Sequence, residues 1–314
     1  MIIVTGGAGF IGSNLVKDLN NLGHKNIIIV DSINQLKKNN LKNLDYLKLI
    51  DKKNFIINFD RELFKKCKFF FHQGACSDTT NSDDDYMYKN NFNYSKVMLE
   101  RCLDFNIPFI YASSASVYGL GINGFKEEVS CENPLNIYAK YKLDFDNYVR
   151  SIIKSSLSQI VGLRYFNVFG PHEFHKKNMA SVMFHFYNQL KKDNCVKVFK
   201  GNQNIKNGEH SRDFISVEEC INVNLFFFNQ CKESGIFNVG TGTSNSYNKI
   251  ANSLIKNFGQ GHIDYIDFPE ILIGKYQNYT KADMSNLLKL GYKYKINNID
   301  EAIKSYYLWL RKNY

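Results

Sequence analysis

The chain has 314 residues, enough for a large hydrophobic core in one or two domains. Hydrophobic residues make up 44% and aromatic residues 15% of the sequence, which excludes an intrinsically disordered chain. The formal net charge is +10, but the basic residues are scattered lysines without a dense basic run, so we expect no nucleic-acid partner.

In the first half of the chain, short apolar segments alternate with longer amphipathic ones. The predicted strands are 1–5, 26–30, 54–59, 68–75, 107–114 and 159–170. The predicted helices run through 14–23, 93–105 and 143–157. Uniformly apolar strands between helices indicate a parallel sheet covered on both faces, with right-handed crossovers. The predicted fold is therefore α/β, with a Rossmann-type doubly wound parallel sheet.

The pattern changes after Gly170. A helix over 179–192 is followed by short predicted strands at 195–199, 235–240 and 263–268, and by a helix over 299–313. We interpret this half as a smaller, partly interleaved α/β domain. The predicted boundaries are 1–167 plus about 216–240 for the Rossmann domain, and about 168–215 plus 241–314 mainly for the smaller domain.

A glycine-rich segment, "TGGAGFIG" at 5–12, follows the first predicted strand and opens the first helix. Glycines at such a junction permit a tight turn and let backbone N–H groups approach a pyrophosphate at the helix N-terminus. Asp31 follows Gly12 by nineteen residues, at the end of the second predicted strand, where an acidic residue binds the adenosine ribose. This context predicts a nicotinamide dinucleotide site. Charge leaves NAD and NADP open, because the lysine pairs 37–38 and 52–53 could neutralise a ribose phosphate.

A serine-tyrosine-lysine set follows the strand at 107–114. Ser114 lies at the strand end, and Tyr138 and Lys142 are four residues apart, so they share one face of a helix. Tyrosine ionises near pH ~10, which is too high for a base at neutral pH. We expect a neighbouring ammonium and an oxidised nicotinamide to lower the pKa of Tyr138. Serine before Tyr-x-x-x-Lys, behind a glycine-rich N-terminus, resembles the extended short-chain dehydrogenase/reductase superfamily.

Further segments narrow the resemblance. Together they are similar to the ADP-L-glycero-D-manno-heptose 6-epimerase family and span nearly the whole chain: "HQGACSDTT", "YASSASVYG", "PLNIYAKYK", "RYFNVFGP", "HKKNMASVMFH", "RDF" and "GKYQNYTKADMSNL". The resemblance implies a Rossmann domain with a small substrate domain, bound NADP, and inversion of carbon 6 of an ADP-linked heptose for the lipopolysaccharide inner core. It also implies a homo-oligomer, a pentamer.

The resemblance assigns roles by position. The implied cofactor residues, beyond Gly6, Gly7, Gly9 and Gly12, are Phe10, Ile11, Asp31, Ser32, Lys37 or Lys38, Lys52, Gln73, Gly74, Ala75, Cys76, Ser77, Asn90, Lys142, Val168 and Lys176. The implied substrate residues are Asn167, Asn178, His185, Phe199, Lys200, Gly201, Asn202, Arg212 and Tyr276. Asn178 replaces the family's serine, and the loop between Gly201 and Arg212 is about five residues longer than the family pattern.

The implied chemistry uses two proton carriers. Hydride leaves carbon 6 for NADP while a base removes the hydroxyl proton, and the resulting ketone presents its other face before the hydride returns. We expect Tyr138 and Lys176 to serve one pose each, with Ser114 bonding the reacting oxygen. The alternatives are another nucleotide-sugar epimerase, such as a hexose 4-epimerase, or a non-catalytic NADP-sensing regulator.

The remaining features concern thiols, metals and membranes. Seven irregularly spaced cysteines, with neither a Cys-x-x-Cys pair nor a secretory signal, predict reduced thiols and a cytoplasmic protein. No apolar run approaches a membrane span, so no membrane association is expected. His172 and His175 form H-x-x-H without neighbouring ligands, and no metal site is predicted.

Overall fold

A wholly parallel seven-stranded sheet forms the centre of the larger unit of the protein. The computed structural model describes residues 1–32, 34–202, 204–269, 277–295 and 298–314. The strand order is β11-β6-β5-β4-β1-β2-β3, the doubly wound arrangement predicted from the sequence. Its strands are β1 (Ile2–Thr5), β2 (Ile27–Asp31), β3 (Lys48–Asp51), β4 (Phe69–His72), β5 (Phe109–Ser114), β6 (Ile160–Tyr165) and β11 (Gly235–Val239).

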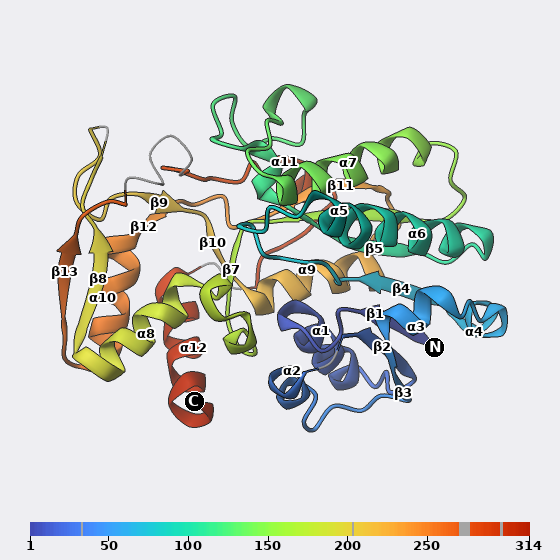
Figure 1. The fold of residues 1–314 in the computed structure, drawn as a ribbon, viewed down its shortest axis with the longest axis horizontal. Coiled ribbons are helices and arrows are strands. Elements are labelled where there is room, and N and C mark those ends of the chain that lie inside the picture. Colours follow the sequence, from blue (N-terminus) through green and yellow to red (C-terminus); the bar gives the residue numbers. More distant parts are fainter. Residues whose placement is uncertain (33, 203, 270–276, 296–297) are drawn as a thin grey trace.

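Helices cover both faces of this sheet (Figure 1). They are α1 (Phe10–Asn21), α2 (Gln35–Asn40), α3 (Lys52–Ile57), α4 (Arg61–Lys66), α5 (Asp84–Met87), the π-helix η1 (Tyr88–Asn93), α6 (Tyr94–Asp104), the 3-10 turns η2 (Ala115–Tyr118) and η3 (Val129–Cys131), α7 (Ile137–Ile152), α9 (Val217–Asn229) and α11 (Ser285–Lys289). The strands alternate between two cores. Val4 packs on the side of α1 and α9, and Ile3 on the side of α6 and α7.

A smaller unit fills the left of Figure 1. It contains β7 (Asn167–Phe169), the 3-10 helix η4 (Phe174–Met179), α8 (Val182–Asp193), β8 (Cys195–Phe199), β9 (Ser211–Arg212), β10 (Phe214–Ser216), β12 (Asn245–Ser246), α10 (Tyr247–Phe258), β13 (His262–Ile266) and α12 (Ile299–Asn313). A separate hydrophobic core joins α8, α10 and α12. Met284 and Leu287 instead pack into the core of the large sheet, although they come from the range expected mainly in the smaller domain.

Two predicted strands are wrong. Residues 54–59 do not form a strand: α3 occupies 52–57, because the Asp51 carboxylate caps the backbone N–H groups of Lys53 and Asn54. The third strand is the shorter, less apolar β3 just before it. The segment 159–170 is two strands, since the chain leaves the large sheet after Tyr165 and β7 pairs with β10.

Two further findings concern the cysteines and possible membrane-spanning helices. All seven cysteines are free thiols. Among the described residues, no helix is long and apolar enough to cross a bilayer.

Candidate active site

The glycine-rich turn lies at the point where the sheet changes direction, between β1 and β4. Gly6 has φ +66, and a Cβ there would lie 2.6 Å from the backbone nitrogen of Gly74. A Cβ on Gly12 would lie 2.2 Å from the carbonyl oxygen of Gly6. The turns after β1 and β4 therefore touch, and the N-terminus of α1 opens beside them. Ligands of doubly wound sheets bind at this position, outside the carboxyl ends of the strands.

Asp31 brings together several predicted cofactor residues at the end of β2. Its buried carboxylate accepts hydrogen bonds from the Ala8 backbone N–H at 3.0 Å and from Lys37 Nζ at 2.6 Å. Lys52 Nζ donates to Asn90 Oδ1 at 2.7 Å, and burial followed by the Lys37 charge lowers the pKa of Lys52. Of the lysine pair left open by the sequence, Lys37 faces Asp31 and Lys38 is exposed.

The loop 73–77 is held by a residue that sequence analysis missed. Asn91 is fully buried in the π-helix η1, where its side chain accepts from the Cys76 N–H at 2.8 Å and donates to the Cys76 carbonyl at 2.9 Å. Single π-turns inside α-helices are frequent at functional sites. The available signal was the three asparagines in "KNNFN", since asparagine is a poor former of helix interiors.

The Tyr138 hydroxyl lies close enough to Ser114, at the carboxyl end of β5, for the serine to influence its pKa. Burial raises the pKa of Tyr138, and the interaction with Ser114 opposes this. The lowering expected from the Lys142 ammonium is not found here, because Lys142 Nζ donates to the Ala112 carbonyl at 2.6 Å. Burial lowers the pKa of Lys142 to about 8. The Cys76 thiol lies within electrostatic range of Tyr138 and Lys142, so the loop 73–77 adjoins the predicted catalytic set.

A buried ion network ties the helix that carries Tyr138 to the sheet. Asp146 on α7 accepts from Arg164 Nε at 2.8 Å, and from the hydroxyls of Tyr111 at 2.8 Å and Ser113 at 2.9 Å on β5. Arg164 also pairs with Glu132 at 2.5 Å. Arg164 and Asp146 are both fully buried. The network thus sets the position of α7 relative to β5, and so of Tyr138 relative to Ser114.

Lys176 reaches from η4 to the start of α1, beside the glycine-rich turn. Its Nζ lies 5.3 Å from the centre of the Phe10 ring, at the start of α1. Burial lowers the pKa of Lys176, while Glu173 raises it. Asn178 is exposed nearby. The H-x-x-H histidines bond within the protein: His172 Nδ1 to Ser13 Oγ at 3.0 Å, and His175 Nδ1 to the His172 carbonyl at 3.0 Å.

The predicted substrate residues lie in the smaller unit or at its junction with the sheet. Asn202 Oδ1 bonds the His210 ring at 2.9 Å, and Lys200 pairs with Asp267 at 2.7 Å. Phe199 packs edge-on against Phe268. Arg212 is 4% exposed, with its guanidinium 5.8 Å from the Tyr247 ring centre. The loop after Gly201 folds back on itself, since the Gly208 N–H bonds the Phe199 carbonyl.

The other predicted site residues are mostly exposed or partly exposed and make fewer contacts that fix their side chains. Asn167 starts β7 and is exposed, with Thr280 Oγ1 3.4 Å from its Oδ1. His185 lies on α8, its ring 6.3 Å from that of Phe184. Tyr276 lies outside the described residues. In the cofactor set, Ala75 and Ser77 are exposed, and Ile11, Ser32, Gln73 and Val168 are partly exposed.

Comparisons with known proteins agree with this geometry. An ADP-L-glycero-D-manno-heptose-6-epimerase from Brachyspira hyodysenteriae is 48% identical over 318 residues, covering 100% of this chain and 98% of that protein. The crystal structure of the Helicobacter pylori ADP-L-glycero-D-manno-heptose-6-epimerase has a TM-score of 0.84 at 30% identity, covering 99% of this chain and 96% of that one.

A neighbour with a different reaction is also similar. The UDP-N-acetylglucosamine 4-epimerase from Methanobrevibacter ruminantium, in complex with UDP-N-acetylmuramic acid, has a TM-score of 0.87 at 27% identity. It covers 100% of this chain and 98% of that one. The model of the NAD dependent epimerase/dehydratase family matches residues 2–240. This match covers the glycine cradle, Asp31 and the serine-tyrosine-lysine set, and with the full-length relatives it shows that the chain belongs to the NAD dependent epimerase/dehydratase family.

Proposed function

We propose that this chain converts ADP-D-glycero-D-manno-heptose to ADP-L-glycero-D-manno-heptose by epimerisation at carbon 6. The observation that carries the proposal is the 48% identity, over the full chain, to a relative named for this activity. The neighbouring Ser114 and Tyr138, with a buried Lys142 one helical turn further along α7, support it, because this reaction needs a proton carrier at the sugar hydroxyl.

The cofactor in this proposal is NADP, with NAD as the alternative. The cradle fits a dinucleotide, since Gly6 and Gly12 leave no room for side chains where the backbone approaches a pyrophosphate. Lys37 beside Asp31, with Lys52 near both, supports a ribose phosphate at this position. When bound, the nicotinamide accepts a hydride from carbon 6 and returns it.

The chain's own residues move the protons and hold the sugar. Ser114 would bond the reacting oxygen, and Tyr138 would take the hydroxyl proton in one pose. Lys176 would do so in the other, and its lowered pKa makes the neutral amine easier to reach. Lys142 would hold the nicotinamide ribose. Arg212 would pair with an ADP phosphate, near the loop 199–202.

The biological setting follows from the same resemblance. We infer a role in forming the lipopolysaccharide inner core, a cytoplasmic location and a homopentamer. Size-exclusion chromatography with light scattering tests the oligomer directly.

The decisive experiment is incubation with ADP-D-glycero-D-manno-heptose and NADP, with product stereochemistry read by NMR. The proposal predicts the L-glycero epimer without net consumption of NADP. A parallel incubation with UDP-hexoses tests a 4-epimerase, which the structural match to such an enzyme favours as the second candidate. Turnover of the UDP-hexose alone would replace the proposal. No turnover of either sugar, with calorimetry showing NADP binding, would instead favour a regulator.

A further inference from the structure

A cluster of metal-ligating side chains lies on the small sheet formed by β8 and β13, away from the predicted active site. The two strands run parallel, with His262 opposite Cys195 and Asp264 opposite Lys197. Val196 and Val198 point into the core beside α8 and α10. Because side chains alternate along a strand, Cys195, His262 and Asp264 lie together on the opposite face.

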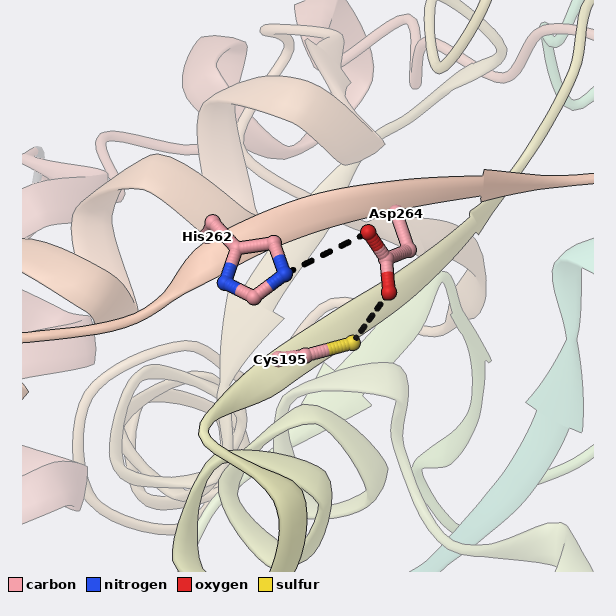
Figure 2. Close-up of side chains that lie close together, drawn as sticks. All are labelled: Cys195, His262 and Asp264. Carbon is pink, nitrogen blue, oxygen red and sulfur yellow. Dashed lines mark hydrogen bonds and ion pairs between the residues drawn. The ribbon is translucent and has the colours of Figure 1, made fainter.

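The Cys195 thiol and the His262 ring both point toward the Asp264 carboxylate (Figure 2). The Cys195 thiol donates to Asp264 Oδ2 at 3.0 Å, and His262 Nε2 lies 3.3 Å from Asp264 Oδ1. One ligand atom from each residue lies within 4.8 Å of the others. Zinc bonds of about 2.0–2.3 Å to nitrogen, oxygen and sulfur imply ligand separations of roughly 3.4–3.6 Å in a tetrahedron. Small side-chain rotations would therefore bring all three atoms onto one ion.

The cluster is open on one side. The side chains of His262 and Asp264 are 64% and 54% exposed, while Cys195 is only 6% exposed. An ion and a solvent ligand can thus enter from the outer face, while the sulfur is supplied by the buried Cys195 on β8. An exposed carboxylate near a histidine is common without a metal. The distinguishing feature is the thiol aimed at the same carboxylate from the paired strand.

We propose that the outer face of the β8–β13 sheet binds one divalent transition-metal ion of the zinc class, with Cys195, His262 and Asp264 as its three protein ligands. The mixed sulfur, nitrogen and oxygen set selects zinc or cobalt over magnesium and calcium, which prefer oxygen. On binding, the thiol proton passes to solvent and a water completes the fourth position. No electron transfer is involved.

The position suggests a stabilising role. The ion would join the first residue of β8 to β13, and β8 leads directly into the predicted sugar loop 199–202. At the other end of the strands, the Lys200 N–H bonds the Ile266 carbonyl at 2.7 Å. A metal would thus secure the end of the two-stranded sheet that lies farther from that loop.

Titration of the full chain with Co²⁺ tests the proposal, because a thiolate bound to Co²⁺ gives a charge-transfer band in the near ultraviolet. We expect one Co²⁺ per chain, displaced by one equivalent of Zn²⁺, and a melting temperature that rises with Zn²⁺. Cys195→Ser should abolish the band. His262→Gln and Asp264→Asn should each weaken binding by about 100-fold or more, since even residues that only orient ligands affect affinity 10- to 100-fold.

Two variants serve as matched controls. Lys197→Gln changes an exposed residue of the same face without removing a ligand, so the band should remain. Cys76→Ser removes a partly exposed thiol elsewhere, so the band should again remain. A band absent from the wild type would overturn the proposal. So would a band retained in Cys195→Ser, or one lost in Cys76→Ser.

Discussion

The two halves of the predicted site hold their functional residues by different means. On the sheet side, Tyr138 and Lys142 lie on α7, which is fastened by the buried Arg164–Asp146–Glu132 network. In the smaller unit, Lys200 is held by a pair with Asp267 whose side chains are 50% and 90% exposed.

The difference concerns how freely each group of predicted residues can move. Proton transfer needs fixed geometry, and buried charge pairs with satisfied hydrogen bonds permit little movement. Surface loops held by exposed pairs adapt at little cost, because such pairs contribute weakly.

The largest expected effect comes from breaking the buried network. Arg164→Met leaves Asp146 and Glu132 without their shared buried cation, so we expect a loss of about 3–5 kcal/mol in unfolding free energy. Urea denaturation measures it. Arg150→Met is the matched control, because Arg150 is the other partner of Glu132 and is partly exposed. This variant should lose about 1 kcal/mol or less in unfolding free energy. Equal losses in the two variants would contradict the contrast between a fully buried and a partly exposed arginine.

The two predicted bases should come next. Tyr138→Phe keeps the ring and Lys176→Met keeps much of the stem, so both variants should stay folded and bind NADP. Each should lose epimerisation by about 100-fold or more, equivalent to about 2.7 kcal/mol. Single-turnover reduction of bound NADP, measured with each epimer separately, should show that each variant retains more activity with the opposite epimer. A wild-type rate in Lys176→Met would leave Tyr138 to serve both faces.

The buried arginine of the smaller unit should have an intermediate effect. Arg212→Lys keeps the charge but loses the planar pair of donors, and Arg212→Ala loses both. A charge-assisted phosphate contact is worth about 1.5–3 kcal/mol, so KM should rise by roughly 10- to 150-fold in Arg212→Ala and less in Arg212→Lys. Lys206→Ala, an exposed charge on the same loop, controls for net charge. Unchanged kinetics in a folded Arg212→Ala variant would remove this residue from the site.

The smallest effect should come from the exposed pair. Lys200→Met should leave the melting temperature unchanged and alter KM by less than about fivefold, because both partners already exchange with water. Differential scanning fluorimetry and initial rates measure both quantities. A large fall in melting temperature would mean that the loop is held as rigidly as the sheet side.

The sequence by itself determined the elements and motifs that depend on near neighbours. The order of strands and helices around the cradle follows from apolar period and glycine placement, and the shared face of Tyr138 and Lys142 follows from helical spacing. Sequence patterns also gave a wrong prediction where the same residues fit both a strand and a helix. Three apolar residues at 55–57 fit a strand or a short helix, and the Asp51 cap decided for the helix.

Only the tertiary structure decided which distant residues meet. It selected Lys37 over Lys38 beside Asp31 and buried Asn91 against the Cys76 backbone. It also placed Arg164 between the carboxylates of Asp146 and Glu132. It also brought Cys195 to Asp264, 69 residues later in the chain. These contacts depend on how sheets and helices pack and on strand register. A one-residue shift in strand register would turn every side chain of that strand to the other face. Spacing between residues close in sequence therefore does not identify which distant side chains meet.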